Sequence, residues 1–120
     1  MIDIKDLQIG DWVMDGKEPA QVTILTCDGI IETTSRVSNI EVIEPISITP
    51  EILDKNGFEK RKMYYVRADD GFELWYYPHL SNLRYEFQGK LVAKSPDGMN
   101  YVHQLQHFLH LCGINKTIKL

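Results

Sequence analysis

The sequence predicts an α+β fold in which two small antiparallel β units accompany a short helix and a longer one. Short apolar runs separated by Asp-Gly steps fill most of residues 7–93, a pattern typical of β-hairpins. One long helical pattern follows at residues 100–112, where apolar side chains recur with the 3.6-residue period. A chain of 120 residues is expected to be a single domain, residues 1–120, with subdomains at residues 1–45 and 46–120 as the alternative.

The first β unit is predicted as a small SH3-like meander or open barrel. Strands are expected at residues 12–14, 20–26, 30–33 and 40–43. Turns are expected at Asp15-Gly16 and Asp28-Gly29, because glycine accepts the positive φ that tight hairpin turns require. The opening stretch Ile9-Gly10-Asp11-Trp12-Val13 resembles the first strand of many such barrels.

A short helix is predicted near residues 50–56. Thr49 is a good N-cap, Pro50 suits the first helical position, and Gly57 can end the helix in the left-handed conformation. Phe58 is then expected to pack on Leu53. Two turns of helix are too few to be stable alone, so this helix depends on packing against the rest of the chain.

The second β unit is predicted from strands at residues 63–68, 72–77, 83–87 and 91–93. If Asp70-Gly71 forms a two-residue loop, Val66 pairs with Trp75 and Tyr64 pairs with Tyr77. Nine of the twelve aromatic residues lie within residues 58–87, so at least one face of this sheet must be covered. The long helix is the expected cover, and residues 117–120 are expected to add an edge strand.

The long helix is expected to begin at an Asn100 cap and to end at Gly113. Its predicted packing face is apolar and consists of Tyr101, Val102, Leu105, Phe108, Leu109 and Cys112. A narrow strip on the other side consists of His103, His107 and His110. We interpret this strip as a solvated polar face whose histidines are partly packed against a neighbouring loop.

His103 and His107 are the candidate metal ligands, since histidines four residues apart on a helix can share one Zn²⁺. In the zinc protease motif with this spacing a glutamate follows the first histidine, but here Gln104 cannot act as the general base. His110 lies about two turns from His103, roughly 10 Å along the helix, too far for one ion. A metal-dependent enzyme is therefore the least favoured functional hypothesis, and no cofactor is expected.

The candidate binding residues are Trp75, Tyr77, Tyr64 and Arg67, because exposed aromatic side chains on a sheet can stack on bases or bury against a protein. The net charge of −4, with no basic cluster larger than residues 60–62, disfavours a broad contact with a nucleic-acid backbone. A nucleic-acid-binding module is therefore the alternative. A protein partner or self-association is preferred.

Several functional classes lack their usual sequence signals. There is no phosphate-binding glycine loop, no serine-hydrolase elbow and no apolar run of membrane-spanning length. The N-terminus does not resemble a secretory signal, and the two cysteines, Cys27 and Cys112, have no CxxC spacing. These observations predict a cytoplasmic protein with reduced cysteines, no membrane partner and no enzymatic activity.

Five stretches, taken together, touch most of the chain: residues 6–11, Ile46-Ser47-Ile48-Thr49-Pro50-Glu51-Ile52-Leu53, Asn56-Gly57-Phe58-Glu59, Tyr101-Val102-His103-Gln104-Leu105-Gln106-His107 and Leu111-Cys112-Gly113. In these stretches the sequence resembles an uncharacterised family of small proteins that is frequent in gut Bacteroidetes genomes, often among prophage and mobile-element genes. The resemblance implies a source and a size class and supplies no catalytic residues. With it, the leading expectation is a non-enzymatic accessory or interaction protein of phage or mobile-element type.

Overall fold

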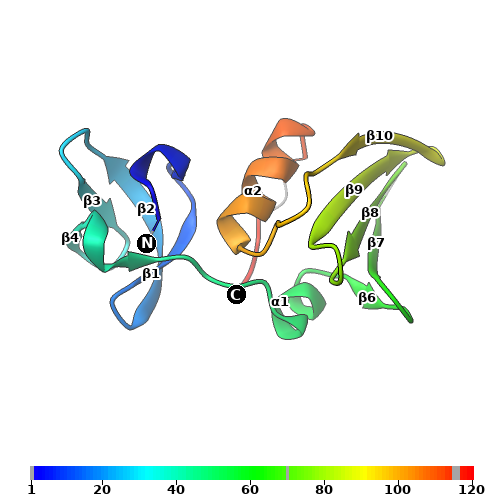
Figure 1. The fold of residues 1–120 in the computed structure, drawn as a ribbon, viewed down its shortest axis with the longest axis horizontal. Helices are drawn as coiled ribbons and strands as arrows, with labels where there is room; N and C mark the ends of the chain where they lie inside the picture. The colour runs from blue at the N-terminus through cyan, green and yellow to red at the C-terminus, as the bar shows by residue number, and fades with distance from the viewer. Residues whose placement is uncertain (1, 70, 115–116) are drawn as a thin grey trace. The chain divides into compact units, whose positions relative to one another are not determined.

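The computed structural model of the chain describes residues 2–69, 71–114 and 117–120. It confirms the α+β prediction: two antiparallel five-stranded sheets occur with a short helix and a longer one (Figure 1). The chain divides into two compact units, Met1–Ser47 with Tyr101–His103, and Ile48–Asn100 with Gln104–Leu120. The alternative subdomain boundary at residues 45 and 46 lies close to this division, and the single-domain prediction stays a prediction.

The sheet of the first unit has the strand order β4-β3-β2-β1-β5. Its strands are β1 (Trp12–Asp15), β2 (Glu18–Leu25), β3 (Ile30–Thr33), β4 (Val37–Asn39) and β5 (Ile43–Glu44), with 3-10 helices η1 (Ile4–Asp6) and η2 (Ile40–Val42). The predicted strand at residues 40–43 is therefore wrong over most of its length. The side chain of Asn39 accepts a hydrogen bond from the Glu41 backbone N–H, which caps the 3-10 turn in place of a strand.

The predicted turn at Asp15-Gly16 joins β1 to β2, although the loop begins one residue later than expected. Asp15 pairs with Glu18, so Gly16 and Lys17 form the two-residue loop, and Gly16 has a φ of +68°. A glycine at the first loop position is what a type II′ hairpin requires. The second Asp-Gly step lies between β2 and β3, where Gly29 has a φ of +86°.

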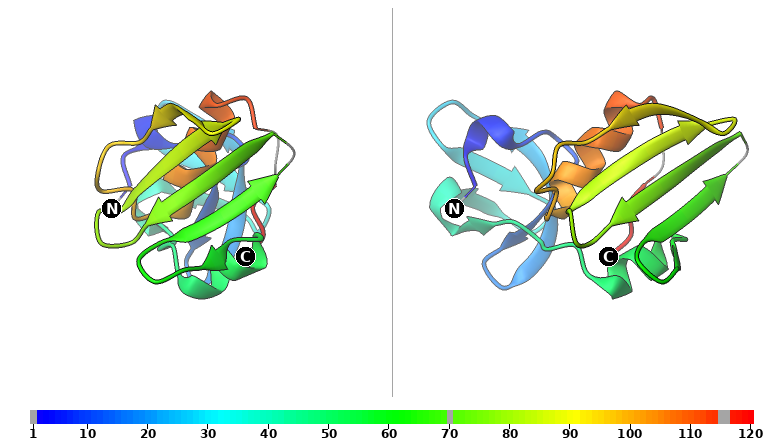
Figure 2. Two further views of the ribbon diagram at one scale, coloured as in Figure 1. Left: turned by 90° about the vertical axis from the view of Figure 1, so that its right-hand side faces the viewer. Right: turned by 45° about the vertical axis from the view of Figure 1, so that its right-hand side comes forward.

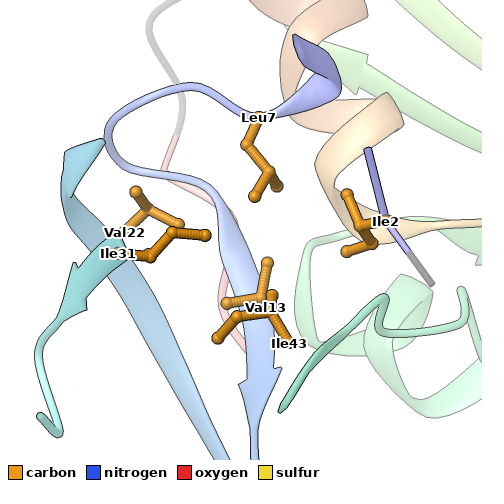
Figure 3. Packing of buried hydrophobic residues seen from close by; sticks show 6 residues of the cluster. All are labelled: Ile2, Leu7, Val13, Val22, Ile31 and Ile43. Atoms are coloured by element: carbon orange, nitrogen blue, oxygen red, sulfur yellow. The ribbon is translucent and has the colours of Figure 1, made fainter. Parts of the chain in front are cut away.

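The core of the first unit is a cluster of aliphatic side chains enclosed by its sheet and the N-terminal segment (Figure 3). The cluster consists of Ile2, Leu7, Val13, Val22, Ile31 and Ile43, all buried. Val13, Val22 and Ile31 come from three adjacent strands and face the same side of the sheet. This unit therefore has an apolar core of its own.

The sheet of the second unit has the order β10-β9-β8-β7-β6. Its strands are β6 (Glu59–Lys60), β7 (Tyr65–Asp69), β8 (Phe72–Tyr77), β9 (Asn82–Phe87) and β10 (Lys90–Lys94). The predicted register is confirmed, because Val66 pairs with Trp75. Of the predicted Asp70-Gly71 turn, Gly71 has a φ of +82°, whereas Asp70 lies outside the described residues.

Helix α1 (Pro50–Lys55) has the predicted caps. The Thr49 side chain accepts a hydrogen bond from the Ile52 backbone N–H, and Pro50 occupies the first turn. At the other end Gly57 has a φ of +82°, and the Phe58 backbone N–H donates to the Leu53 carbonyl over 3.0 Å. A bond of this kind closes a helix that is followed by a left-handed residue, which is Gly57 here. It brings the buried Phe58 and Leu53 together.

Helix α2 (Val102–Leu111) lies on one face of the second sheet (Figure 2). The predicted packing face is confirmed at its centre, since Val102, Leu105, Phe108 and Leu109 are buried. The helix starts later than predicted because Tyr101 forms a β-bridge with Ser47. It ends as predicted at Gly113, after which the Ile114 backbone N–H donates to the Leu109 carbonyl.

The predicted C-terminal edge strand is wrong, because residues 117–120 form no strand. This segment is instead held by the side chain of Asn56, which donates to the Lys119 carbonyl and accepts from the Lys119 backbone N–H, each over 2.7 Å. Ile118 is buried. Within the described parts of the chain, neither helix is long and apolar enough to cross a membrane.

Candidate interaction face on the second sheet

The second sheet has an inner face that contacts the core and an outer face on its opposite side. The register places Leu74, Tyr76 and Leu83, all buried, on the inner face. The alternating positions form the outer face, which includes Tyr64, Val66, Glu73, Trp75, Tyr77, Arg84 and Glu86, with Glu59 on β6 and Leu91 and Lys94 on β10. Among the described residues of the second unit, no helix or strand lies over the outer face (Figure 2).

Three of the four predicted binding residues form one aromatic cluster on this outer face. The ring centroids of Tyr64 and Trp75 are 4.7 Å apart, and those of Tyr64 and Tyr77 are 5.6 Å apart. All three side chains are half-buried. At one end of the cluster, the exposed ring of His79 meets Tyr77 edge-on at 6.1 Å.

The fourth predicted residue, Arg67, does not belong to this cluster. It pairs with Leu74 and so lies on the inner face, where its Nη1 donates to the Asn56 carbonyl over 2.8 Å and its Nε donates to Asp69 over 2.9 Å. Its prediction as a binding residue is not supported by this placement. The signal was present in the sequence, because a residue next to Val66 on the same strand must point to the opposite face.

Arg84 is a cation of the outer face, and Lys94 is its cross-strand partner on β10. Its guanidinium carbon lies 5.0 Å from the centroid of the Tyr77 ring, within the range of a cation–π contact. Its Nε and the indole Nε1 of Trp75 are buried and have no hydrogen-bond acceptor in the described part of the chain. The face therefore has a cation beside the aromatic cluster, with two buried donors beneath it that have no acceptor among the described residues.

Two carboxylates lie together at the other end of the outer face. Glu73 on β8 pairs directly with Glu86 on β9, so two negative side chains project from opposite positions of the ladder. Neither takes part in any of the ion pairs found within residues 2–69, 71–114 and 117–120. Like charges directly opposite each other destabilise a sheet. Glu73 and Glu86 thus face each other across the ladder without an ion pair among the described residues, and Arg84 lies one outer-face position away on β9.

The three histidines of the strip, predicted to be solvated and partly packed against a neighbouring loop, differ in exposure. His103 is only 5% exposed, and its ring stacks on that of Tyr101 with centroids 5.9 Å apart. His107 is half-buried and His110 is exposed. The described residues contain no group of three or more His, Cys, Asp or Glu side chains placed to hold one metal ion. His103 and His107 as metal ligands therefore stay a prediction.

A shallow groove of about 280 Å³ lies beside the histidine strip in the second unit. Its walls are the Ser95–Met99 loop and the side chains of Gln104, His107, Phe108 and Leu111. Asp97 at its rim accepts a hydrogen bond from the Asn82 side chain over 2.8 Å. The residues of this groove could not be predicted from the sequence, because the loop reaches α2 only through the fold of the sheet.

The buried carboxyl group of Asp15 in the first unit is structural. Thr33 Oγ1 and Ser38 Oγ each donate to it over 2.7 Å, and Arg36 Nε donates over 3.1 Å. Burial by itself raises the pKa of Asp15, but the three hydrogen bonds and the Arg36 charge more than offset that effect and lower the pKa below its usual value. A carboxylate saturated in this way is not available to a ligand.

The two cysteines differ in accessibility. Cys27 is exposed, whereas Cys112 is partly buried and burial raises the pKa of its thiol. A raised pKa keeps a thiol protonated, and the protonated form is a poor nucleophile. The expectation that Cys112 is not a reactive thiol agrees with this environment.

The chain matches no known family model, no curated protein and no solved structure. What the outer face of the second sheet can bind must therefore be inferred from its own side chains. It combines a half-buried aromatic cluster, a cation and a pair of carboxylates.

Proposed function

We propose that the chain is a non-enzymatic accessory module that binds a protein partner through the outer face of its second sheet. The observation that carries this proposal is the half-buried cluster of Tyr64, Trp75 and Tyr77 on a face that α2 does not cover. Aromatic side chains are enriched at the centres of protein interfaces, because each buries a large area with few rotatable bonds. A cytoplasmic setting and an origin in a phage or mobile element belong to the same proposal.

The first unit is proposed to be an SH3-like half-barrel that supports this module. Its strand order β4-β3-β2-β1-β5, with the 3-10 turn Ile40–Val42 before the last strand, favours that description. The buried carboxylate of this unit, Asp15, already accepts hydrogen bonds from Thr33 and Ser38. The binding role is therefore assigned to the second unit.

Single-stranded nucleic acid is the second candidate ligand of the same face. Arg84 over the Tyr77 ring favours it, because aromatic rings and guanidinium groups together stack on bases. The carboxylates of Glu73 and Glu86 oppose it, because they repel phosphate groups at the same surface. The net charge of −4 also disfavours binding of a nucleic acid.

Site-specific photo-crosslinking tests the proposal. A benzophenone amino acid replaces Tyr77 on the outer face in one variant and the exposed Lys55 of α1 in a matched control. Irradiation of cells that carry the gene is expected to give a protein adduct from position 77 and none from position 55. An adduct with an oligonucleotide would support the second candidate. Equal labelling from both positions, or none from position 77, would contradict a binding role for this face.

A further inference from the structure

We propose that the groove between the loop of residues 95–99 and α2 binds a lysine or arginine side chain of a partner protein. The site goes beyond the proposed function, because the groove shares no residue with the outer face of the second sheet. Three features of the groove carry the inference: its apolar wall, its single carboxylate and the buried amide that holds this carboxylate in place.

Large apolar side chains form one wall of the groove. Met99 from the loop and Phe108 from α2 are buried, whereas Leu111 beside them is 86% exposed. Among the large hydrophobic side chains in the described part of the chain, Leu111 has the greatest exposed fraction. The stem of a long side chain that lies along this wall removes Leu111 from contact with water, which favours binding.

The size of the groove limits what it can hold. Its volume of about 280 Å³ is just below the range of roughly 300–1,000 Å³ that is typical of pockets for drug-sized ligands. A helix or a strand of a partner is far larger than that. The occupant that fits is therefore one side chain, presented by a segment that stays outside the groove.

Asp97 sets the charge of the groove. It is the carboxylate among the described lining residues, which include neither lysine nor arginine, and His107 is the other titratable side chain of the lining. Asp97 takes part in none of the ion pairs found within residues 2–69, 71–114 and 117–120. The hydrogen bond that it accepts comes from the neutral amide of Asn82. The groove therefore combines negative charge with an apolar wall, which complements a basic side chain.

Asn82 holds this carboxylate in place from within the fold. Its side chain is fully buried, and its Nδ2 donates to Asp97 Oδ1 over 2.8 Å. The Oδ1 atom of the same amide is buried and has no donor in the described part of the chain. This oxygen adds negative partial charge close to the carboxylate. A carboxylate that is already fixed loses less conformational freedom when it binds a cation.

Other occupants fit the groove less well. An acidic side chain or a phosphate group is repelled by Asp97. A purely apolar side chain removes water from the carboxylate without supplying a donor, which is unfavourable. A lysine or arginine side chain supplies both the apolar stem and the donors.

Amide NMR spectra of the full chain, recorded during titration with N-acetyl-arginine methylamide, test the site. A single side chain binds weakly, so a dissociation constant on the order of millimolar is expected. The largest shifts are expected at the backbone amides of Asp97, Gly98 and Leu111, which line the groove. The norleucine analogue has a stem without charge and is expected to bind about fivefold more weakly, the value of one exposed ion pair. The glutamate analogue is expected to cause no shifts there.

Two variants separate the contributions of charge and stem. Asp97→Asn removes the charge but keeps an oxygen that can accept from Asn82, and should weaken binding of the arginine probe about fivefold. Asp54→Asn at an exposed position of α1 is its matched control and should leave binding unchanged. Leu111→Ser shortens the wall at an exposed position, so it should weaken the arginine and norleucine probes by a similar factor. Amide spectra that overlay with wild type away from the groove verify that each variant is folded.

The source of the basic group is tested with butylguanidinium, which has the same stem and head without peptide groups. It is expected to bind no more tightly than the arginine probe. Tighter binding would assign the groove to a free amine or guanidine and overturn a protein partner.

The remaining outcomes decide whether the site exists. Shifts at the groove that require both the charge of the probe and the charge of Asp97 support it. No response to the arginine probe overturns it, as does equal binding of the arginine and norleucine probes or equal binding by wild type and Asp97→Asn. These results do not depend on the crosslink from position 77, so the site and the proposed function can fail separately.

Discussion

The two sheets of the molecule each contain a carboxylate site, and the surroundings of the two sites differ. In the first sheet Asp15 is buried and accepts hydrogen bonds from Thr33, Ser38 and Arg36. In the second sheet Glu73 and Glu86 stand directly opposite each other with no ion pair in the described part of the chain. The contrast is between these two sites and not between whole sheets, because Asp69 of the second sheet pairs with Arg67. Asp15 is satisfied within the chain, whereas Glu73 and Glu86 form no ion pair among the described residues.

The largest expected effect is a loss of core packing in the second unit, where Leu105 on α2 is 1% exposed. Leu105→Ala should lower the free energy of unfolding by about 2–5 kcal/mol, because the truncation removes buried contacts and leaves a cavity. His107→Ala on the half-buried side of the same helix is the control and should cost less than about 1 kcal/mol. Urea unfolding followed by circular dichroism measures both, and equal losses would mean that α2 presents a different face to the sheet.

The next largest loss of stability is expected when the buried carboxylate of Asp15 in the first unit is removed. Asp15→Ala removes the acceptor of Thr33 Oγ1, Ser38 Oγ and Arg36 Nε, and the two hydroxyl donors are left buried. We expect a loss of about 2–4 kcal/mol in the free energy of unfolding, reduced from the value for a fully buried ion pair because Arg36 is half exposed. The exposed Glu41 is the control, and Glu41→Ala should change it by less than about 0.5 kcal/mol.

A third prediction concerns the pH dependence of the same carboxylate. The folded chain lowers the pKa of Asp15, mainly because its hydrogen bonds outweigh the opposing effect of burial. The resulting stability is fully present above the unfolded pKa of about 3.9 and is lost as the pH falls through the lower folded pKa. The difference in unfolding free energy between wild type and Asp15→Asn should therefore shrink between about pH 4 and pH 2. A difference that stays constant over that range would contradict a lowered pKa.

The elements that could be predicted from the sequence are those fixed by local chemistry. Thr49, Pro50 and Gly57 define α1 through hydrogen-bonding and backbone preferences that act within a few residues. The pairing of Val66 with Trp75 follows from the length of one turn. The burial of Leu105 follows from helical periodicity.

The features that could not be predicted depend on contacts between distant segments. His103 belongs to the histidine strip by periodicity, yet it is buried and stacks on Tyr101, whose position is set by the bridge to Ser47. The pairing of Glu73 with Glu86 requires the register of β8 with β9, which the break at residues 78–81 does not define. For the same reason Arg84 could not be placed beside Tyr77 from the sequence.

The smallest expected effect gives the most direct test of the contrast between the two sites. Glu86→Gln removes one of two like charges that face each other across the ladder, while keeping the shape of the side chain. Asp15→Asn is the matched change in the first sheet, where the carboxylate is compensated. Urea unfolding of both variants beside wild type compares the two carboxylates in one experiment.

The account predicts changes of opposite sign in the free energy of unfolding. Asp15→Asn should lower it by about 1–3 kcal/mol, because a charge-assisted acceptor is lost from a buried network. Glu86→Gln should raise it by a few tenths of a kcal/mol, because the repulsion with Glu73 is removed. A loss of stability in Glu86→Gln comparable to that in Asp15→Asn would show that the carboxylates of the second sheet are compensated within the chain, and would contradict the central claim.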